Sequence, residues 1–144
     1  MRWLVVLLLS LGLGACGYIP FSGGKLEGTV TEAPTDWSGL ADADIIQLET
    51  NPAEPYSVKL WVIGMEGALY VHAGANRATW VEHIEDDSRV RMKIGDAIFE
   101  LEAAQVSDAD EFRRFSDIYE KKYGNRPRNE NIAEVYLYRL TPRA

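Results

Sequence analysis

Few side chains in this 144-residue sequence have a type and a spacing that suit chemistry. The two histidines and the single cysteine are too few for a Cys/His zinc cluster. His72 and His83 are the only side chains that could serve as axial ligands of a haem. Arg77, two residues before Thr79 at the expected start of a short helix, could hold an anion. For each of these side chains the plainer interpretation is a solvated or structural role, and the sequence indicates no catalytic residue.

The cysteine, Cys16, follows a short hydrophobic segment. Arg2 is followed by the apolar residues 3–9 and then by small residues up to the cysteine. This order is typical of a secretory signal peptide, and the segment is too short to cross a bilayer as a helix. The stretch Leu13-Gly14-Ala15-Cys16 resembles a bacterial lipobox. The resemblance implies that residues 1–15 are removed as a signal peptide and that Cys16 is acylated.

Lipidation at Cys16 would anchor the chain to a membrane, because two or three acyl chains on one residue are enough for stable anchoring. Gly17, rather than aspartate, follows the cysteine. In lipoproteins this pattern implies the periplasmic face of the outer membrane, so we expect a location in the cell envelope. Removal of residues 1–15 changes the net charge from -7 to -8, because it removes Arg2 and no acid. Such an acidic chain is not expected to bind nucleic acid.

The rest of the sequence divides into a lead-in and one domain. Residues 16–43 are rich in glycine and proline and are expected to form a tether with a loosely ordered lead-in. Residues 44–144 carry the alternation typical of strands, beginning with a strand at 44–50 and a hairpin at 56–73. The helical spacing of apolar residues then predicts a short helix over about 76–85.

A second hairpin, formed by residues 88–94 and 97–106 around Gly95-Asp96, has a register that the two-residue turn defines. Met92 then lies opposite Phe99 on the core face. On the other face opposite charges meet, which disfavours slipped registers; the expected pairs are Arg89 with Glu102 and Arg91 with Glu100. The basic row of this strand could instead bind an anion, although the facing glutamates favour a salt-bridged solvent surface.

A second helix follows the hairpin. Ser107 or Asp108 is expected to cap it and Gly124 to end it. Its aromatic stripe at 112, 115, 119 and 123 is the pattern of a core-facing side. A last strand is expected over 132–140. Five or six antiparallel strands with two helices suit a small closed or half-closed β-barrel.

Several segments resemble the split-barrel flavoproteins, in particular the deazaflavin-dependent nitroreductases and pyridoxamine-phosphate-oxidase-like proteins. The matching segments occur in the family's order, at residues 67–74, 77–80, 87–95, 106–111 and 119–124. The resemblance covers about residues 44–140. It implies a mainly β fold, a six-stranded antiparallel split barrel, in a homodimer that holds flavin mononucleotide (FMN) or a deazaflavin at its interface.

The sequence departs from that family where the cofactor phosphate is held. The family's loop between the first two strands supplies arginine, serine and glycine, whereas residues 51–55 read Asn-Pro-Ala-Glu-Pro. Two prolines donate no backbone hydrogen bond, and Glu54 repels an anion. The resemblance leaves five cofactor-binding candidates: Lys59, Arg77, Thr79, Trp80 and His83.

Two hypotheses follow. One is a lipid-anchored envelope protein whose degenerate flavin-binding-like barrel serves as a binding or interaction module, with a small-molecule ligand or a protein partner. The alternative is a flavin- or deazaflavin-dependent oxidoreductase of the envelope, in which the cofactor does the chemistry. A haem-binding barrel is a third, weaker alternative.

Overall fold

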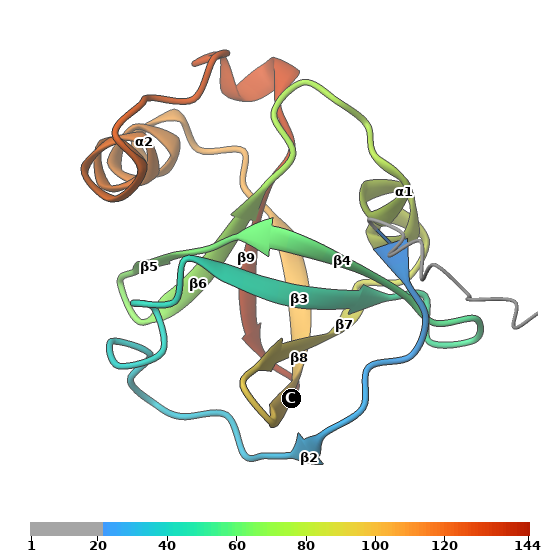
Figure 1. Ribbon diagram of the computed structural model, residues 1–144. Coiled ribbons are helices and arrows are strands. Elements are labelled where there is room, and N and C mark those ends of the chain that lie inside the picture. The colour runs from blue at the N-terminus through green and yellow to red at the C-terminus, as the bar shows by residue number, and fades with distance from the viewer. Residues whose placement is uncertain (1–21) are drawn as a thin grey trace, which may run out of the picture.

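The computed structural model describes residues 22–144 as a strongly curled antiparallel sheet with two helices (Figure 1). The lipobox and the signal peptide lie outside the described residues. The strands are β1 (Ser22–Gly23), β2 (Thr29–Val30), β3 (Ile45–Thr50), β4 (Tyr56–Trp61), β5 (Ile63–Met65), β6 (Ala68–His72), β7 (Arg89–Ile94), β8 (Ala97–Gln105) and β9 (Leu137–Pro142). The helices are α1 (Thr79–Asp86) and α2 (Ala109–Tyr123), and Ile132–Glu134 form a 3-10 turn.

The sheet has the order β1-β4-β3-β7-β8-β9-β6-β5 with antiparallel neighbours, and β2 pairs with β8 in the parallel direction. The mainly β barrel-like fold with two helices is therefore confirmed. Strands β3, β4, β6, β7, β8 and β9 have five or more residues each and correspond to the six expected strands, while β1, β2 and β5 are short additions.

The expected hairpin at residues 56–73 is only partly correct. β4 pairs with β3, and only β5 pairs with β6, around the turn at Glu66-Gly67. Val62 lies between β4 and β5 and is buried. Because the chain passes from one ladder to another at Val62, it curls the sheet instead of continuing one flat hairpin.

The β7–β8 hairpin has the expected register. Met92 faces Phe99 and Ile94 faces Ala97, and Gly95 occupies a left-handed conformation with φ 58°. Glycine adopts this conformation without the steric cost that other residues bear. The two-residue turn therefore defines the pairing as the sequence predicts.

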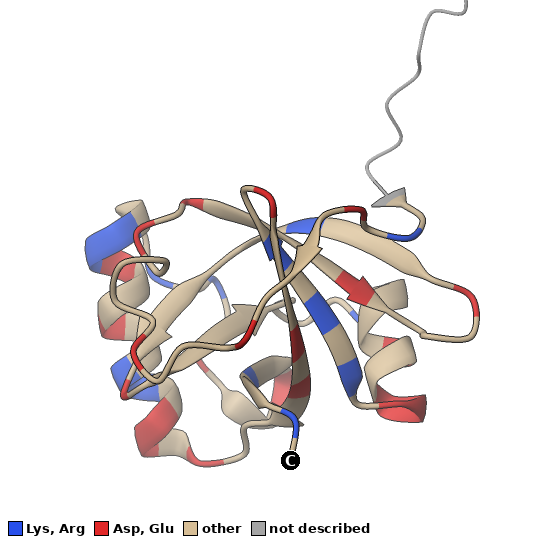
Figure 2. Ribbon diagram, turned by 90° about the horizontal axis from the view of Figure 1, so that it is seen from below, with Lys and Arg blue, Asp and Glu red and all other residues tan. Residues whose placement is uncertain are grey.

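The expected ion pairs across this hairpin are wrong, although the residues lie opposite each other as predicted. Arg91 instead pairs with Glu49 at 3.2 Å, because β3 lies on the other side of β7 and places Glu49 beside it. Arg89 pairs with Asp87 at 2.6 Å. The outward face of β7 is salt-bridged, with partners that the sequence did not indicate. Figure 2 shows acidic and basic residues interspersed over the ribbon.

Helix α2 has the ends that the sequence predicts. The Asp108 side chain accepts a hydrogen bond from the backbone N–H of Glu111 at 2.8 Å, and Gly124 closes the helix with φ 81°. The last strand, by contrast, begins at Leu137 and not at residue 132. The side chain of Asn131 accepts a hydrogen bond from Ala133 and starts the 3-10 turn that precedes the strand.

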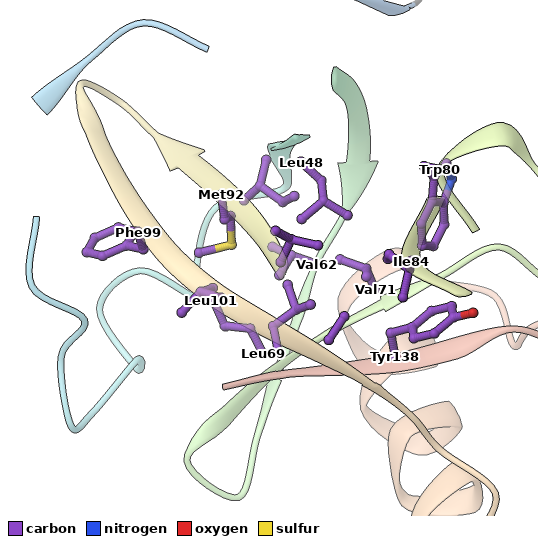
Figure 3. Close-up of a cluster of buried hydrophobic side chains, with 14 of the residues drawn as sticks. Leu48, Val62, Leu69, Val71, Trp80, Ile84, Met92, Phe99, Leu101 and Tyr138 are labelled. Carbon is purple, nitrogen blue, oxygen red and sulfur yellow. The ribbon is translucent and has the colours of Figure 1, made fainter. Parts of the chain in front are cut away.

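Apolar side chains fill the curled sheet, as Figure 3 shows for residues from β3, β6, β7, β8, β9 and α1. A second cluster lies between the outside of the sheet and α2. Successive side chains of β6 point to opposite faces of the sheet, so this strand contributes to both clusters. Leu69 and Val71 belong to the inner cluster and Tyr70 to the outer one. The outer cluster brings α2 against β5 and β6.

The described part of the lead-in is not loosely ordered. It runs along the outside of the barrel (Figure 1), and β2 pairs with the start of β8. The backbone N–H of Leu26 donates to the buried carboxylate of Glu49 at 2.6 Å. Trp37 is 3% exposed and packs edge-on against Phe99 at 5.1 Å between ring centroids. The expectation of a loose lead-in fails because Trp37 is a core residue that the sequence placed in a linker.

The end of the lead-in is held by α2. The Lys122 ammonium donates to the backbone carbonyls of Ala41, Ala43 and Val62 at 2.6–2.8 Å. Gly64 permits this close packing, because a Cβ atom there would lie 2.5 Å from the Cβ of Ala41. The lead-in, the bend at Val62 and α2 therefore form one packed unit.

Candidate functional site

The five cofactor-binding candidates fall in two regions of the molecule. Arg77, Thr79, Trp80 and His83 lie in or just before α1, whereas Lys59 lies on β4 and lines a cavity beside α2. Within the described residues, the other four line no part of that cavity. The structure therefore does not bring the five side chains together around one cavity.

Trp80 and Thr79 occupy different environments at the start of α1. Trp80 is 4% exposed and packs against Tyr138 inside the curled sheet, with 5.8 Å between ring centroids. Its ring is part of the core and offers no open face to a ligand. Thr79, the first residue of α1, is exposed.

Arg77 is engaged by two carboxylates of α1. It pairs with Glu82 at 3.0 Å and also with Glu85, and the hydrogen bond to Glu85 raises the pKa of the guanidinium. These pairs are largely exposed, and exposed pairs contribute little to stability. They nevertheless neutralise Arg77, the side chain that the sequence indicates as a candidate for binding an anion at this helix.

His83 joins α1 to the ends of β3 and β4. Its Nδ1 lies 2.9 Å from the Thr50 hydroxyl, and its ring meets Tyr56 edge-on at 5.2 Å. The loop between these strands closes on itself, because the backbone N–H of Glu54 donates to the carbonyl of Asn51 at 3.0 Å. Asn51 has φ 57°, and Glu54 is exposed. The loop is a compact turn with a carboxylate at its tip and no cation.

A cavity of about 240 Å³ lies between the outer face of β4, β5 and β6 and the helix α2. Aromatic rings and one histidine make up most of its wall; the lining residues are Lys59, Leu60, Trp61, Ile63, Tyr70, His72, Phe115 and Tyr119. The sequence does not predict this cavity. Its only signals in the sequence are Lys59 and the aromatic stripe of α2, and such a stripe by itself indicates a core-facing side.

Trp61 forms the open side of the cavity. It is 48% exposed and stacks on Tyr123, with centroids 4.3 Å apart and planes within 10°. Tyr119 lies 5.8 Å away in a tilted arrangement. The stacked tyrosine is held in turn, because its hydroxyl donates to the carbonyl of Asp44 at 2.7 Å. Trp61 is thus supported from behind while part of its ring faces solvent.

Tyr70 is fixed at the cavity wall by a partly buried charge pair. Its hydroxyl donates to Glu111 at 2.7 Å, and the guanidinium of Arg139 donates to both oxygens of the same carboxylate. Burial alone would raise the pKa of Glu111, but the hydrogen bonds from Tyr70 and Arg139 outweigh it and the pKa is lowered. The pair holds the first turn of α2 against β6 and β9.

His72 is a largely buried polar residue of the cavity wall. Its ring lies 5.6 Å from Phe115 and 6.1 Å from Tyr119 between centroids. Its Nε2 is buried and has no hydrogen-bond partner among residues 22–144. Burial lowers the pKa of His72 to about 4, because the charged imidazolium loses its hydration. His72 is therefore neutral at pH 7, with one nitrogen available to donate and the other to accept.

Acidification should destabilise the fold through His72. An unfolded histidine titrates near pH 6.5, whereas the folded His72 has a pKa of about 4. Between these values the unfolded state binds the proton and the folded state does not, so the free energy of unfolding falls as the pH falls. We expect a loss of about 3 kcal/mol by pH 4 relative to pH 7, measured by urea unfolding.

The control for this prediction is the variant His72→Phe, which should show a smaller loss between pH 7 and pH 4 than the wild type. Equal pH dependence in the wild type and in His72→Phe would contradict the prediction.

Within the described residues, no helix is long and apolar enough to span a bilayer. Over the same residues, no three His, Cys, Asp or Glu side chains gather as metal ligands.

Comparison with known proteins supports the fold and gives no closer relationship. Neither a protein-family model nor a curated protein matches the sequence. Solved structures do match. A candidate pyridoxamine 5′-phosphate oxidase from Listeria innocua has a TM-score of 0.57 and 15% identity over 73% of this chain and 88% of its own. The chain has the pyridoxamine-phosphate-oxidase-like split-barrel fold.

Other solved structures share this fold with similar TM-scores and sequence identities. A NimC/NimA family protein from Clostridium acetobutylicum has a TM-score of 0.54 and 15% identity, over 71% of this chain and 76% of its own. An FAD-binding protein from Mesorhizobium loti has a TM-score of 0.52 and 15% identity, over 73% and 85%. One further structure, at TM-score 0.56 and 14% identity over 75% and 87%, is a domain-swapped dimer. At these identities the likeness establishes the fold alone.

Proposed function

We propose that this protein is a lipid-anchored protein of the cell envelope whose split barrel is a binding or interaction module and does not hold a flavin phosphate. The observation that carries the proposal is the pairing of Arg77 at α1 together with the composition of the β3–β4 loop. Arg77 is neutralised by Glu82 and Glu85, and the loop presents Glu54 where a phosphate would need donors. The cavity beside α2, with its largely aromatic wall, offers a place for a ligand.

The second candidate is a flavin- or deazaflavin-dependent oxidoreductase. One structure with this fold is an FAD-binding protein from Mesorhizobium loti, and it supports a flavin as the ligand. An absorbance spectrum of the purified mature chain separates the two candidates. The binding module predicts no flavin or deazaflavin band, and a stoichiometric band would establish the oxidoreductase. A Soret band would indicate haem instead.

Added FMN should not bind measurably to the mature chain. A phosphate within about 4 Å of Glu54 would be repelled by on the order of 1–4 kcal/mol, which weakens binding about 5- to 1000-fold. A single cation at a helix start returns only about 1–3 kcal/mol, and Arg77 would first have to leave its glutamates. Calorimetric titration with FMN and with a deazaflavin measures this directly.

The loop itself supplies the control for this titration. Glu54→Arg removes the repulsion and adds a cation, and it should raise the affinity for FMN if the loop is what excludes the phosphate. Sub-micromolar binding of either cofactor to the wild type would overturn the binding module. Arg77, Thr79 and Lys59 would then be the first residues to replace.

The membrane anchor is proposed from Cys16 and has its own test. The wild type should partition into the detergent phase of a cloud-point separation, because its acyl chains enter the micelles. The variant Cys16→Ser should remain in the aqueous phase or stay uncleaved. Recovery of the wild type in the aqueous phase would contradict lipidation.

A homodimer belongs to the same proposal. The split-barrel resemblance implies one, and the domain-swapped dimer described above has a similar fold. Analytical ultracentrifugation of the mature chain gives the mass that decides this point.

A further inference from the structure

We infer that the cavity between β4, β6 and α2 binds a small planar aromatic acid, with its ring among the aromatic side chains and its carboxylate at Lys59. The inference rests on the proposed binding module and goes beyond it by naming the class of ligand. It is carried by the size of the cavity, by the composition of its wall and by the single charge on its rim.

The size of the cavity favours one or two fused rings. Its volume of about 240 Å³ exceeds the ~150 Å³ that accommodates benzene in an apolar protein cavity. It lies below the range of about 300–1,000 Å³ usual for drug-sized ligands. A flavin nucleotide would have to extend far beyond this space, whereas a bicyclic ring would fill it.

The wall of the cavity favours an aromatic ring over an aliphatic chain. Trp61 of β4 and Phe115 and Tyr119 of α2 contribute aromatic rings to this wall. Aromatic pairs gain about 0.5–1.5 kcal/mol beyond the area they bury. Trp61 is held by its stack on Tyr123, so it is ordered before a ligand arrives. Such preorganisation lowers the entropy cost of binding.

The polar groups of the cavity specify the rest of the ligand. Lys59 is the one charged side chain of the lining, it is exposed, and it makes no ion pair with another described residue. A cationic ligand would be repelled by Lys59 and would find no carboxylate in the lining. The Nε2 of His72 is unpartnered among the described residues but fully buried, so it presents no accessible polar atom to a ligand. An acidic substituent on an otherwise apolar aromatic ring therefore suits this lining.

A series of three probes with one ring tests the inference on the full mature chain in detergent. The probes are indole-3-acetate, indole-3-acetamide and tryptamine, which are negative, neutral and positive at pH 7. We expect saturable calorimetric binding in the order acetate, acetamide, tryptamine. Backbone amide shifts in NMR spectra should change at Trp61, His72 and Tyr119 and not near α1.

Matched variants separate the charge from the ring. Lys59→Met should remove the preference for acetate over acetamide, about two- to fivefold for an exposed pair, while Lys121→Met, a lysine of α2 outside this cavity, should retain it. Trp61→Ala should weaken all three probes about tenfold, and Trp61→Phe should weaken them less.

Three outcomes would overturn the inference: no saturable binding of indole-3-acetate, shift changes confined to another region, or a preference for tryptamine. None of these would by itself restore a flavin, because the FMN titration and the absorbance spectrum address that separately. Sub-micromolar FMN binding would in turn refute the proposed function, whatever the indole probes show.

Discussion

Replacing Trp37 with alanine should lower the free energy of unfolding by about 3–5 kcal/mol, the usual cost of truncating a buried tryptophan. Trp37 is 3% exposed, packs against Phe99 and belongs to the main core cluster. Its carbonyl also accepts hydrogen bonds from Leu40 and Ala41. The alanine variant leaves a cavity beneath the lead-in that the surrounding backbone can fill only in part. Urea unfolding at pH 7 measures the loss.

Trp61→Ala is the control for Trp37→Ala, because Trp61 is 48% exposed and lies on the outer face of the sheet. It should cost clearly less. If Trp37→Ala costs under about 1 kcal/mol, the lead-in contributes little to the fold, and a domain starting at residue 44 would be as stable as the longer chain.

Replacing Met92 with alanine should cost about 2–5 kcal/mol, because its side chain is fully buried. Met92 lies inside the curled sheet among Leu48, Val62 and Leu101 (Figure 3). It occupies the core face that the turn at Gly95-Asp96 predicts for its strand. The prediction therefore tests the register and the assignment of faces together.

The conservative variant Met92→Leu serves as the control, since a volume-conserving change in a core costs less than about 1.5 kcal/mol. A cost for Met92→Ala below about 0.5 kcal/mol would mean that the faces of β7 are reversed. Both variants are compared with the wild type in the same urea series.

The features that the sequence determined are those that depend on neighbours along the chain. The turn at Gly95-Asp96 sets the pairing of β7 with β8, because a two-residue turn leaves one register. Asp108 caps α2 by accepting a hydrogen bond from the backbone N–H three residues later, and Gly124 ends the helix in a left-handed backbone conformation. The alternation along a strand likewise separates an inner from an outer face without further information.

The features that only the tertiary structure decided join residues that are far apart in the sequence. Arg91 pairs with Glu49, 42 residues away, and not with the facing Glu100, since the side of β7 that β3 occupies is not encoded locally. Trp37 reads as part of a glycine- and proline-rich linker, and only its contact with Phe99 makes it a core residue.

The candidate site was decided in the same way. The sequence indicates Lys59 as a candidate binding residue, but the aromatic stripe of α2 by itself indicates only a core-facing side of the helix. The chain passes from the β3–β4 ladder to the β5–β6 ladder at Val62, and residues of β4, β5, β6 and α2 then line one cavity. His72 is largely buried in its wall, and burial keeps the imidazole neutral at pH 7. Periodicity shows which side chains share a face of one element, whereas a cavity depends on the distance between two elements, which is set by contacts that no local pattern records.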